Sequence, residues 1–331
     1  MKKFLFTYAI FILLIFFLPV LTVSFSDHAD TGRRASPGIR KYKTARMVKV
    51  LNHKTGEIMQ LNCEDYLCGV VCAEMPAEFP IEALKAQAVA ARSYLENKLA
   101  NGSDKIESHK GADICTDSGH CKAWLSKEDR FAAWDSPEAD NYWQKITTAV
   151  SETAGEIMVY GGSPVNAVFY AISSGKTERA CEVWQADVPY LQSVESPHDV
   201  NAPGYLSSAE FTYDEFKSKM LDADSELNFN SENPHDWYQN EQRSEGGGVL
   251  SCEIGGKTFK GLAVRTALGL RSHNYQLEIK DGKFVFTVKG HGHGVGMSQW
   301  GARFYAEEGK NYRDILRIYY QGITFDNLYE S

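Results

Sequence analysis

Glu74 is the acidic side chain whose sequence surroundings best suit proton transfer. It stands in Cys-Ala-Glu-Met-Pro, residues 72–76, an apolar run directly before a predicted helix. An apolar environment withdraws water from a carboxyl and raises its pKa toward the value that a general acid needs near neutral pH. The alternative is a capping or ion-pairing glutamate with Lys85 or Arg92 as its partner. Local physics alone favours this alternative.

Two histidines and two cysteines stand close together in a polar segment: His109, Cys115, His120 and Cys121. Two nitrogen and two sulfur donors are a preferred set for tetrahedral zinc. Four protein ligands close the coordination shell, so the predicted zinc site is structural, with no position for an activated water. The spacing is looser than in a zinc finger. The alternative is a disulfide between the two cysteines, with incidental histidines.

Other polar side chains stand where they can face a cleft. Lys85 and Arg92 are seven residues apart and share one face of a predicted helix, which is therefore cationic. The end of a predicted strand and the turn after it carry four more: Tyr170, Ser173, Ser174 and Lys176. An ordinary solvated helix face and an ordinary Ser-Ser-Gly turn are the alternatives.

The alternating glycines of residues 290–294 permit close approach of the backbone to a ligand or to another segment. Two histidines, His291 and His293, lie between them. The sequence identifies no further ligands that would make them a metal site.

Hydrophobic periodicity and turn residues predict the elements that position these groups. Helices are expected from Asn62 to about Met75, from Pro80 to Asn101, from Pro137 to Thr153, and from Ser298 and Tyr312. Hairpins are expected from residues 47–51 with 58–61, 156–160 with 165–172, and 275–279 with 284–288. The acidic, Asn-rich residues 222–248 are predicted to be a surface insertion. Because strands and helices do not alternate regularly, the predicted fold class is α+β, of mixed helices and antiparallel hairpins.

The N-terminus predicts attachment to a membrane. Residues 4–25 contain no charge and reach about 33 Å as a helix, enough for the hydrocarbon core. We expect residues 1–3 to be cytoplasmic, 4–25 to be an uncleaved transmembrane anchor, 26–45 a linker and 46–331 an extracytoplasmic domain, with two lobes around a cleft. Basic residues on the far flank of the anchor favour the inverted orientation, but long domains translocate largely regardless of charge. Cleavage of the segment is a second alternative.

The composition excludes some partners. A formal net charge of -8 gives no attraction to nucleic acid phosphates. Seven cysteines are an odd number, so at least one thiol is unpaired or bound to a metal. Buried thiols are the simplest account of Cys63, Cys68 and Cys72, and whether Cys181 pairs with Cys252 stays open.

Three runs of residues resemble a known family. These are Glu74-Met75-Pro76 with residues 82–94 (EALKAQAVAARSY), residues 169–177 (FYAISSGKT) and residues 292–302 (GHGVGMSQWGA). Together they strongly resemble the stage II sporulation protein D family, membrane-anchored peptidoglycan lytic transglycosylases of spore-forming bacteria. The resemblance spans about residues 46–325 and also includes the predicted N-terminal anchor.

The resemblance implies cleavage of the β-1,4 bond between N-acetylmuramic acid and N-acetylglucosamine, with Glu74 as the general acid and base and 1,6-anhydro ends as products. It implies a glycan groove that includes His293 and Gln299, to which the polar side chains above are added: Lys85, Arg92, Tyr170, Ser173, Ser174 and Lys176. Some clostridial-type relatives are similar in carrying zinc at such a cluster.

The resemblance also implies a cellular setting. The substrate is expected to be glycan strands stripped of stem peptides, at the sporulation septum between the mother-cell and forespore membranes. The expected partners are a sporulation amidase or endopeptidase and membrane scaffold proteins of the engulfment machinery. The alternative functions are a zinc-dependent peptidoglycan amidase or peptidase, which the missing His-Glu-x-x-His motif disfavours, and a non-catalytic, zinc-stabilised glycan-binding scaffold.

Overall fold

The computed structural model describes residues 41–43, 46–102, 108–134, 136–184 and 186–329. They belong to one unit, Gly38–Ser331. The predicted cytoplasmic residues 1–3 and anchor 4–25 lie outside the described residues, as does the linker 26–45 apart from residues 41–43. Within the described ranges, no helix is long and apolar enough to cross a membrane.

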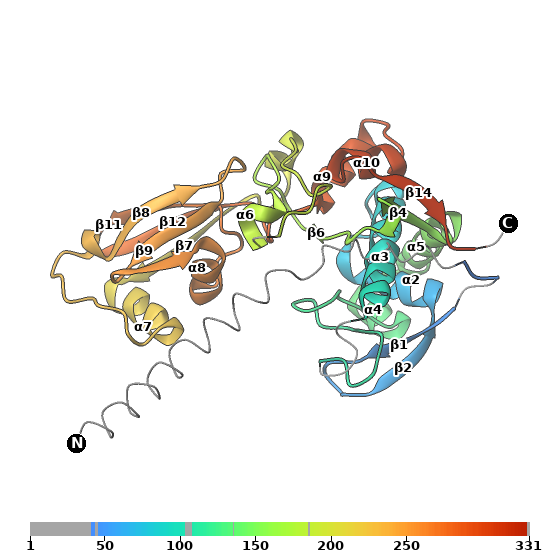
Figure 1. The fold of residues 1–331 in the computed structure, drawn as a ribbon, viewed down its shortest axis with the longest axis horizontal. Helices are drawn as coiled ribbons and strands as arrows, with labels where there is room; N and C mark the ends of the chain where they lie inside the picture. The colour runs from blue at the N-terminus through green and yellow to red at the C-terminus, as the bar shows by residue number, and fades with distance from the viewer. Residues whose placement is uncertain (1–40, 44–45, 103–107, 135, 185, 330–331) are drawn as a thin grey trace, which may run out of the picture. The chain divides into compact units, whose positions relative to one another are not determined.

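Most helices belong to a helical part made of two stretches of chain, residues 41–205 and 290–329 (Figure 1). Its α-helices are α2 (Cys63–Glu74), α3 (Ile81–Asn101), α4 (Lys127–Trp134), α5 (Ala139–Glu152), α6 (Ala180–Trp184), α9 (Gln299–Glu307) and α10 (Tyr312–Tyr319), with the 3-10 helix η1 (Pro197–Asn201). Helix α3 is the centre of this part, because it contacts α2, α5, α9 and α10 and is buried almost without interruption from Ala83 to Glu96.

Three small sheets border these helices. Strands β1 (Met47–Leu51), β2 (Ile58–Asn62) and β3 (Ile114–Cys115) form the order β2-β1-β3, with β1 antiparallel to β2 and parallel to β3. Strands β4 (Glu156–Tyr160), β5 (Ser163–Pro164) and β14 (Thr324–Asn327) form the order β14-β4-β5. Strand β6 (Phe169–Tyr170) pairs in parallel with β13 (Met297–Ser298), which joins the middle of the chain to its C-terminal helices.

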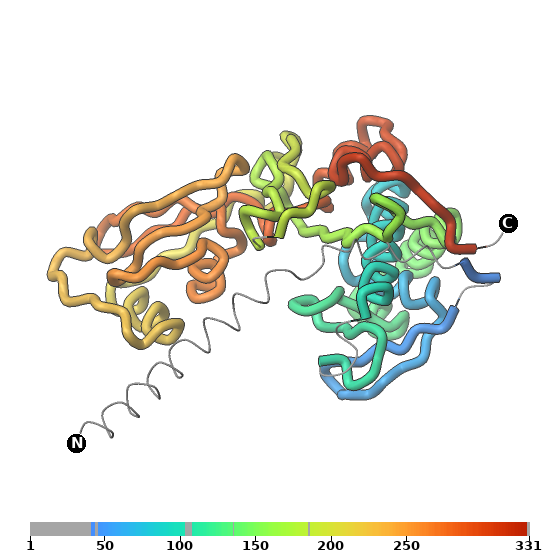
Figure 2. Tube along the Cα trace, in the orientation of Figure 1, coloured from blue at the N-terminus to red at the C-terminus, as the bar shows by residue number. Residues whose placement is uncertain are grey.

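A β-rich part is formed by the continuous stretch 206–289, yellow to orange in Figure 2. Its elements are β7 (Leu206–Thr212), α7 (Tyr213–Ala223), η2 (Pro234–Trp237), β8 (Tyr238–Arg243), β9 (Val249–Ile254), β10 (Lys257–Lys260), α8 (Gly261–Leu268), β11 (Tyr275–Lys280) and β12 (Lys283–Lys289). They form two antiparallel sheets, β10-β9-β8 and β11-β12-β7. This part has a hydrophobic cluster of its own, centred on stacked Phe216 and Phe284.

The α+β class is confirmed, and most predicted elements are present. The Asn62 side chain caps α2 by accepting a hydrogen bond from the Glu64 amide at 2.9 Å. Helix α3 ends at Gly102 in the left-handed region, with φ of 60°, where a residue without Cβ carries no steric penalty. The first and third predicted hairpins are β1–β2 and β11–β12, and helices begin at Gln299 and Tyr312 as expected.

Two segments differ in detail from expectation. Residues 222–248 are mostly exposed, but β8 pairs with β9 and three apolar side chains of the segment, Leu227, Phe229 and Trp237, enter the core of the β-rich part. The predicted pairing of residues 165–172 with β4 is wrong beyond Val165, whose amide donates to the Met158 carbonyl at 3.0 Å. The hairpin partner of β4 is the two-residue strand β5, while Phe169 and Tyr170 pair with β13 instead.

Arg92 of α3 is completely buried and is satisfied by protein groups. Its guanidinium donates to both Glu64 carboxylate oxygens at 3.2 and 2.6 Å and to the carbonyl oxygens of Glu156 and Val150 at 3.0 and 3.4 Å. The Glu64 carboxylate also accepts from the Gly155 amide and the Tyr329 hydroxyl. This geometry favours a structural role for Arg92 over its predicted contact with substrate.

We expect Arg92→Lys to lower the free energy of unfolding by about 2 kcal/mol or more and Arg92→Ala by about 3–5 kcal/mol, measured by urea denaturation. An ammonium cannot replace the forked contacts, and removal of the cation leaves the Glu64 carboxylate uncompensated in a mostly buried site. The control is Arg317→Ala, whose exposed partner is Asp314 at 3.6 Å; we expect a change below about 1 kcal/mol. Unchanged stability with weakened glycan binding in Arg92→Lys would restore the substrate-binding role.

Candidate functional site

Glu74 lines a pocket of about 420 Å³ in the helical part. The walls come from four stretches: the C-terminal end of α2, residues 118–122, β6 with its neighbours 168–171, and residues 291–293, with Trp184 of α6 beside them. Of the predicted site residues, the pocket brings together Glu74, Tyr170, His293 and the metal-cluster residues His120 and Cys121. The candidate acid and the candidate metal ligands thus share one site.

The Glu74 carboxyl is half-buried and held at both oxygens. Oε1 accepts a hydrogen bond from the Ala123 amide at 2.9 Å, and Oε2 accepts one from the Gln299 side-chain amide at 3.4 Å. Burial raises the pKa of Glu74, against the opposing effects of the Lys122 cation and the two hydrogen bonds. At a given pH, a larger fraction of Glu74 is therefore protonated than of an exposed glutamate.

Lys122 is the site residue that sequence reasoning missed. Its side chain is 7% exposed, and its ammonium lies 3.7 Å from the ring centroid of Phe169 and 4.4 Å from that of Tyr94. Burial lowers the pKa of Lys122 to about 8, with the Glu74 charge opposing the change. Two aromatic faces partly replace the water that this cation loses.

His293 is a fixed, neutral part of the pocket wall. Its Nδ1 accepts from the Val295 amide at 3.2 Å, so Nε2 carries the proton and donates to the Phe169 carbonyl at 3.1 Å. Burial lowers the pKa of His293 to about 3. Because both ring nitrogens have partners, this residue offers a glycan its ring surface and not a hydrogen bond.

Gln299 lies behind Glu74 and not among the residues that line the pocket. It is 6% exposed, and its amide nitrogen lies 3.4 Å from both Glu74 Oε2 and Gln87 Oε1. These contacts suit a residue that orients the Glu74 carboxyl, and its predicted place in the glycan groove stays a prediction.

Four further predicted substrate-binding residues do not line the Glu74 pocket. Lys85 pairs with Glu82 at 2.8 Å and with Glu152 at 2.7 Å. Three others are held in the segment after β6. Ser173 is fully buried, Ser174 donates to the Gly246 carbonyl, and Lys176 pairs with Glu245 and Glu195. All four side chains contact other groups of the protein. Although each lies within one of the sequence motifs, none of them reaches the Glu74 pocket.

The predicted metal cluster is assembled. The ligand atoms of His109, Cys115, His120 and Cys121 all lie within 4.8 Å of one another. The His109 Nε2 atom is 3.1 Å from His120 Nδ1 and 3.2 Å from Cys121 Sγ, and Cys115 Sγ is 3.5 Å from His120 Nδ1. Tetrahedral zinc bonds place nitrogen and sulfur ligands roughly 3.3 to 3.8 Å apart. The four donors therefore fit a metal such as zinc, and the two cysteines form no disulfide.

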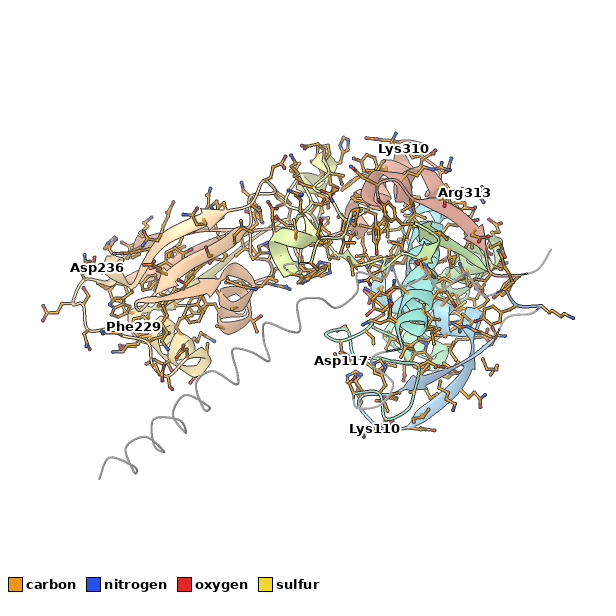
Figure 3. All side chains as sticks on the ribbon, viewed as in Figure 1. Lys110, Asp117, Phe229, Asp236, Lys310 and Arg313 are labelled. Atoms are coloured by element: carbon orange, nitrogen blue, oxygen red, sulfur yellow. The ribbon has the colours of Figure 1, made fainter. Side chains whose placement is uncertain are left out.

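Local backbone structure prepares the cluster. The carbonyl of Asp117, labelled in Figure 3, accepts from the amides of Cys121 and His120 at 2.7 and 3.2 Å, and its carboxylate accepts from the Gly119 amide. On the other side of the loop, Lys110 adopts a positive φ of 51° directly after His109. The loop is thus turned at both ends so that its four donors converge.

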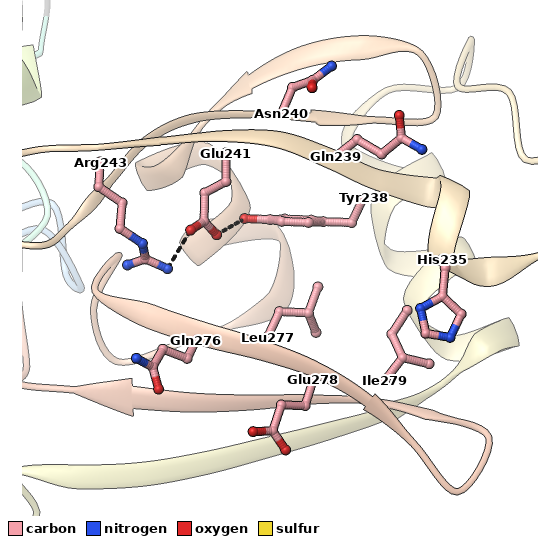
Figure 4. Close-up of a pocket in the computed structure, with 10 residues that line it drawn as sticks. All are labelled: His235, Tyr238, Gln239, Asn240, Glu241, Arg243, Gln276, Leu277, Glu278 and Ile279. Atoms are coloured by element: carbon pink, nitrogen blue, oxygen red, sulfur yellow. Dashed lines mark hydrogen bonds and ion pairs between the residues drawn. The ribbon is translucent and has the colours of Figure 1, made fainter.

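A second pocket, of about 560 Å³, lies on the β-rich part between β8 and β11 (Figure 4). There, Glu241 accepts from Tyr238 at 2.6 Å and pairs with Arg243 at 2.6 Å. This pocket contains none of the predicted site residues, and its Glu241 and Arg243 are paired with each other. The Glu74 pocket is therefore the better candidate for chemistry.

We expect purified protein to contain about one zinc ion per chain, and Cys115→Ser to lose the metal and melt at a lower temperature, because metal binding is coupled to folding of the loop. Elemental analysis and thermal melting measure both effects. Cys181→Ser is the matched control, because Cys181 is a free, half-buried thiol outside the cluster. Full zinc content in Cys115→Ser would contradict the assignment.

Comparisons with known proteins agree with the motifs. Residues 51–160 match the family model described as Stage II sporulation protein. The chain is 36% identical over 302 residues to a protein of Bacillus amyloliquefaciens named Stage II sporulation protein D, covering 89% of this chain and 85% of the relative. The protein of that name from Bacillus subtilis (strain 168) is 34% identical over 340 residues, covering 97% and 95%. A Bacillus subtilis (strain 168) protein named Amidase enhancer is 26% identical over 308 residues, covering 78% of this chain and 40% of that protein. Matches of this length and identity show that the chain belongs to the stage II sporulation protein D family.

Proposed function

We propose that this sporulation protein is a lytic transglycosylase that cleaves the bond between N-acetylmuramic acid and N-acetylglucosamine in peptidoglycan. The observation that carries the proposal is that Glu74 is the one carboxyl among the described residues that line its pocket. Retaining and inverting glycosidases ordinarily need two carboxyl groups across the scissile bond. A transglycosylase needs one, because the substrate supplies its own nucleophile.

In the proposed reaction, protonated Glu74 donates its proton to the glycosidic oxygen as the bond to the muramic acid C1 breaks. The C6 hydroxyl of the same muramic acid attacks C1 and gives its proton to Glu74. The products are a 1,6-anhydro end and a free 4-hydroxyl, and the glutamic acid is regenerated. Attack within one sugar carries the rate advantage of a pre-positioned group.

Three groups support the transient carboxylate. The Ala123 amide and the Gln299 amide donate to its oxygens, and the buried Lys122 cation compensates its charge. Charge-assisted hydrogen bonds in a site that excludes water are stronger than those in bulk solvent. The arrangement therefore suits a carboxyl that must both release and recover a proton.

The metal cluster has a structural role in this proposal. His109, Cys115, His120 and Cys121 would hold zinc, which orders the loop that leads directly into Lys122 and Ala123. Four protein donors leave no open coordination position, and this disfavours the alternative of a zinc-dependent amidase or peptidase. A non-catalytic glycan-binding scaffold is the remaining alternative, and the raised pKa of Glu74 supports catalysis over it.

We further propose the cellular setting that the family suggests: a single-pass anchor at residues 4–25 with an extracytoplasmic catalytic domain, acting on denuded glycan strands at the septum during engulfment. A relative is named Amidase enhancer, which suits a partnership with an amidase. Other proposed partners are an endopeptidase and the membrane scaffold of the engulfment machinery.

We expect Glu74→Gln to lower the turnover of purified glycan strands by about 10²–10⁴-fold while the protein remains folded, because the amide cannot transfer the proton. Mass spectrometry of the digest measures 1,6-anhydro ends. Glu78→Gln, an exposed glutamate four residues away, is the control and should be unaffected. Free reducing ends in the wild-type digest would indicate hydrolysis, and full activity of Glu74→Gln would exclude the mechanism.

The proposed acid also predicts a pH dependence. Activity requires protonated Glu74, so kcat/KM should fall as pH rises through its pKa, which burial holds above the ordinary value of 4.5. Lys122→Met removes a nearby cation that lowers this pKa, so the fall should move to higher pH. Lys127→Met, in α4 outside the pocket, should leave it in place. Zinc content is measured in each variant, and an unmoved or lower transition in zinc-loaded Lys122→Met would contradict the assignment.

A further inference from the structure

Trp184 is an exposed aromatic side chain within the Glu74 pocket. Its side chain is 39% exposed, and among the large exposed hydrophobic residues of the described chain it is the one that lines this pocket. Indole is among the largest apolar surfaces that a side chain offers, and folding ordinarily removes most of it from water. An indole left open at a polar pocket is therefore suited to a ligand.

The backbone that carries Trp184 is well held. The residue ends α6, whose Ala180 and Val183 are buried, and the Ala180 amide donates to the Leu191 carbonyl at 3.1 Å. The indole lies against the His293 ring, with centroids 5.0 Å apart and an interplanar angle of 53°. Since hydrogen bonds at both nitrogens fix the His293 ring, the indole has a rigid support and a remaining surface open to solvent.

We propose that Trp184 is a stacking platform for one pyranose ring of the glycan strand. This inference rests on the proposed function, which supplies the substrate class. One face of an N-acetylated pyranose presents C–H groups, while its edge carries hydroxyl and acetamide groups. An aromatic side chain covers the apolar face and leaves the polar edge to water or to hydrogen-bonding groups of the pocket.

Trp184 and Glu74 line the same pocket but have different neighbours. The indole contacts His293, which bonds to the Phe169 carbonyl, whereas Glu74 accepts from Ala123 and Gln299. In this proposal the sugar on Trp184 is a neighbour of the two sugars whose linking oxygen Glu74 protonates. Its stacking contributes equally to the bound substrate and to the transition state, so it raises affinity without speeding bond cleavage.

Stacking on a C–H face does not require the lactyl group that distinguishes muramic acid. The platform should therefore bind an oligomer of β-1,4-linked N-acetylglucosamine, which lacks muramic acid altogether. This probe separates glycan binding from cleavage.

The test measures binding of the N-acetylglucosamine hexamer by calorimetry to full-length protein carrying Glu74→Gln. Adding Trp184→Ala should weaken Kd roughly tenfold, while Trp184→Phe should keep most of the affinity because an aromatic face remains. Leu206→Ala, 59% exposed and outside the pocket, is the matched control and should not change Kd. Circular dichroism and thermal melting establish that each variant is folded.

The outcomes distinguish the two proposals. If the Glu74→Gln parent does not bind the hexamer, this inference fails, whereas the proposed function fails only if the wild-type protein leaves glycan strands that contain muramic acid uncleaved. If the parent binds and Trp184→Ala changes Kd less than twofold, the stacking inference alone is overturned. With Glu74 intact, Trp184→Ala should raise KM for glycan strands and leave kcat unchanged. A fall in kcat as large as the fall in kcat/KM would overturn the placement away from the cleaved bond.

Discussion

The helical part depends on one buried ion pair. The Arg92 guanidinium joins α3 to the first turn of α2 through Glu64, to α5 through the Val150 carbonyl and to β4 through the Glu156 carbonyl. Glu64 adds the C-terminal segment through Tyr329. An arginine side chain cannot shed its charge inside a protein, so these elements must meet where its donors are satisfied. The far end of the same helix α2 carries Glu74, and the site therefore depends on this pair although no atom of Arg92 is in it.

The second organising feature is a run of three consecutive residues. Cys121 belongs to the metal cluster, Lys122 carries the buried cation, and the Ala123 amide donates a hydrogen bond to Glu74. A single short stretch of backbone thus connects the cluster to the candidate acid. The polar loop has few apolar side chains of its own, and a bound metal would supply the order that a hydrophobic core gives elsewhere.

Local signals made much of the fold predictable from sequence. The caps and breakers around α2 and α3 act within a few residues, and the cluster is visible because its donors are close in sequence. Features that depend on distant contacts were not predictable. No residue near Lys122 in the sequence indicates that its ammonium contacts the Phe169 ring. Likewise, β6 pairs with a strand that begins 128 residues after Phe169. Small residues such as Ala86 and Ala90 let other elements pack closely around α3, so Arg92 of the expected cationic stripe lies inside the protein, while Lys85 is paired with Glu82 and Glu152. The polar composition of residues 222–248 likewise concealed an edge strand.

Glu74 is the last residue of α2, followed by Met75 as the C-cap. The final carbonyls of a helix lack intrahelical partners and carry a partial negative charge, which disfavours a second negative charge beside them. The macrodipole of α2 therefore acts on Glu74 in the same sense as burial and favours the neutral carboxyl. This contribution comes from the backbone, so it persists when neighbouring side chains are replaced. It also has a directional consequence: the first turn of the same helix, where Glu64 lies, presents amide hydrogens and therefore the opposite field.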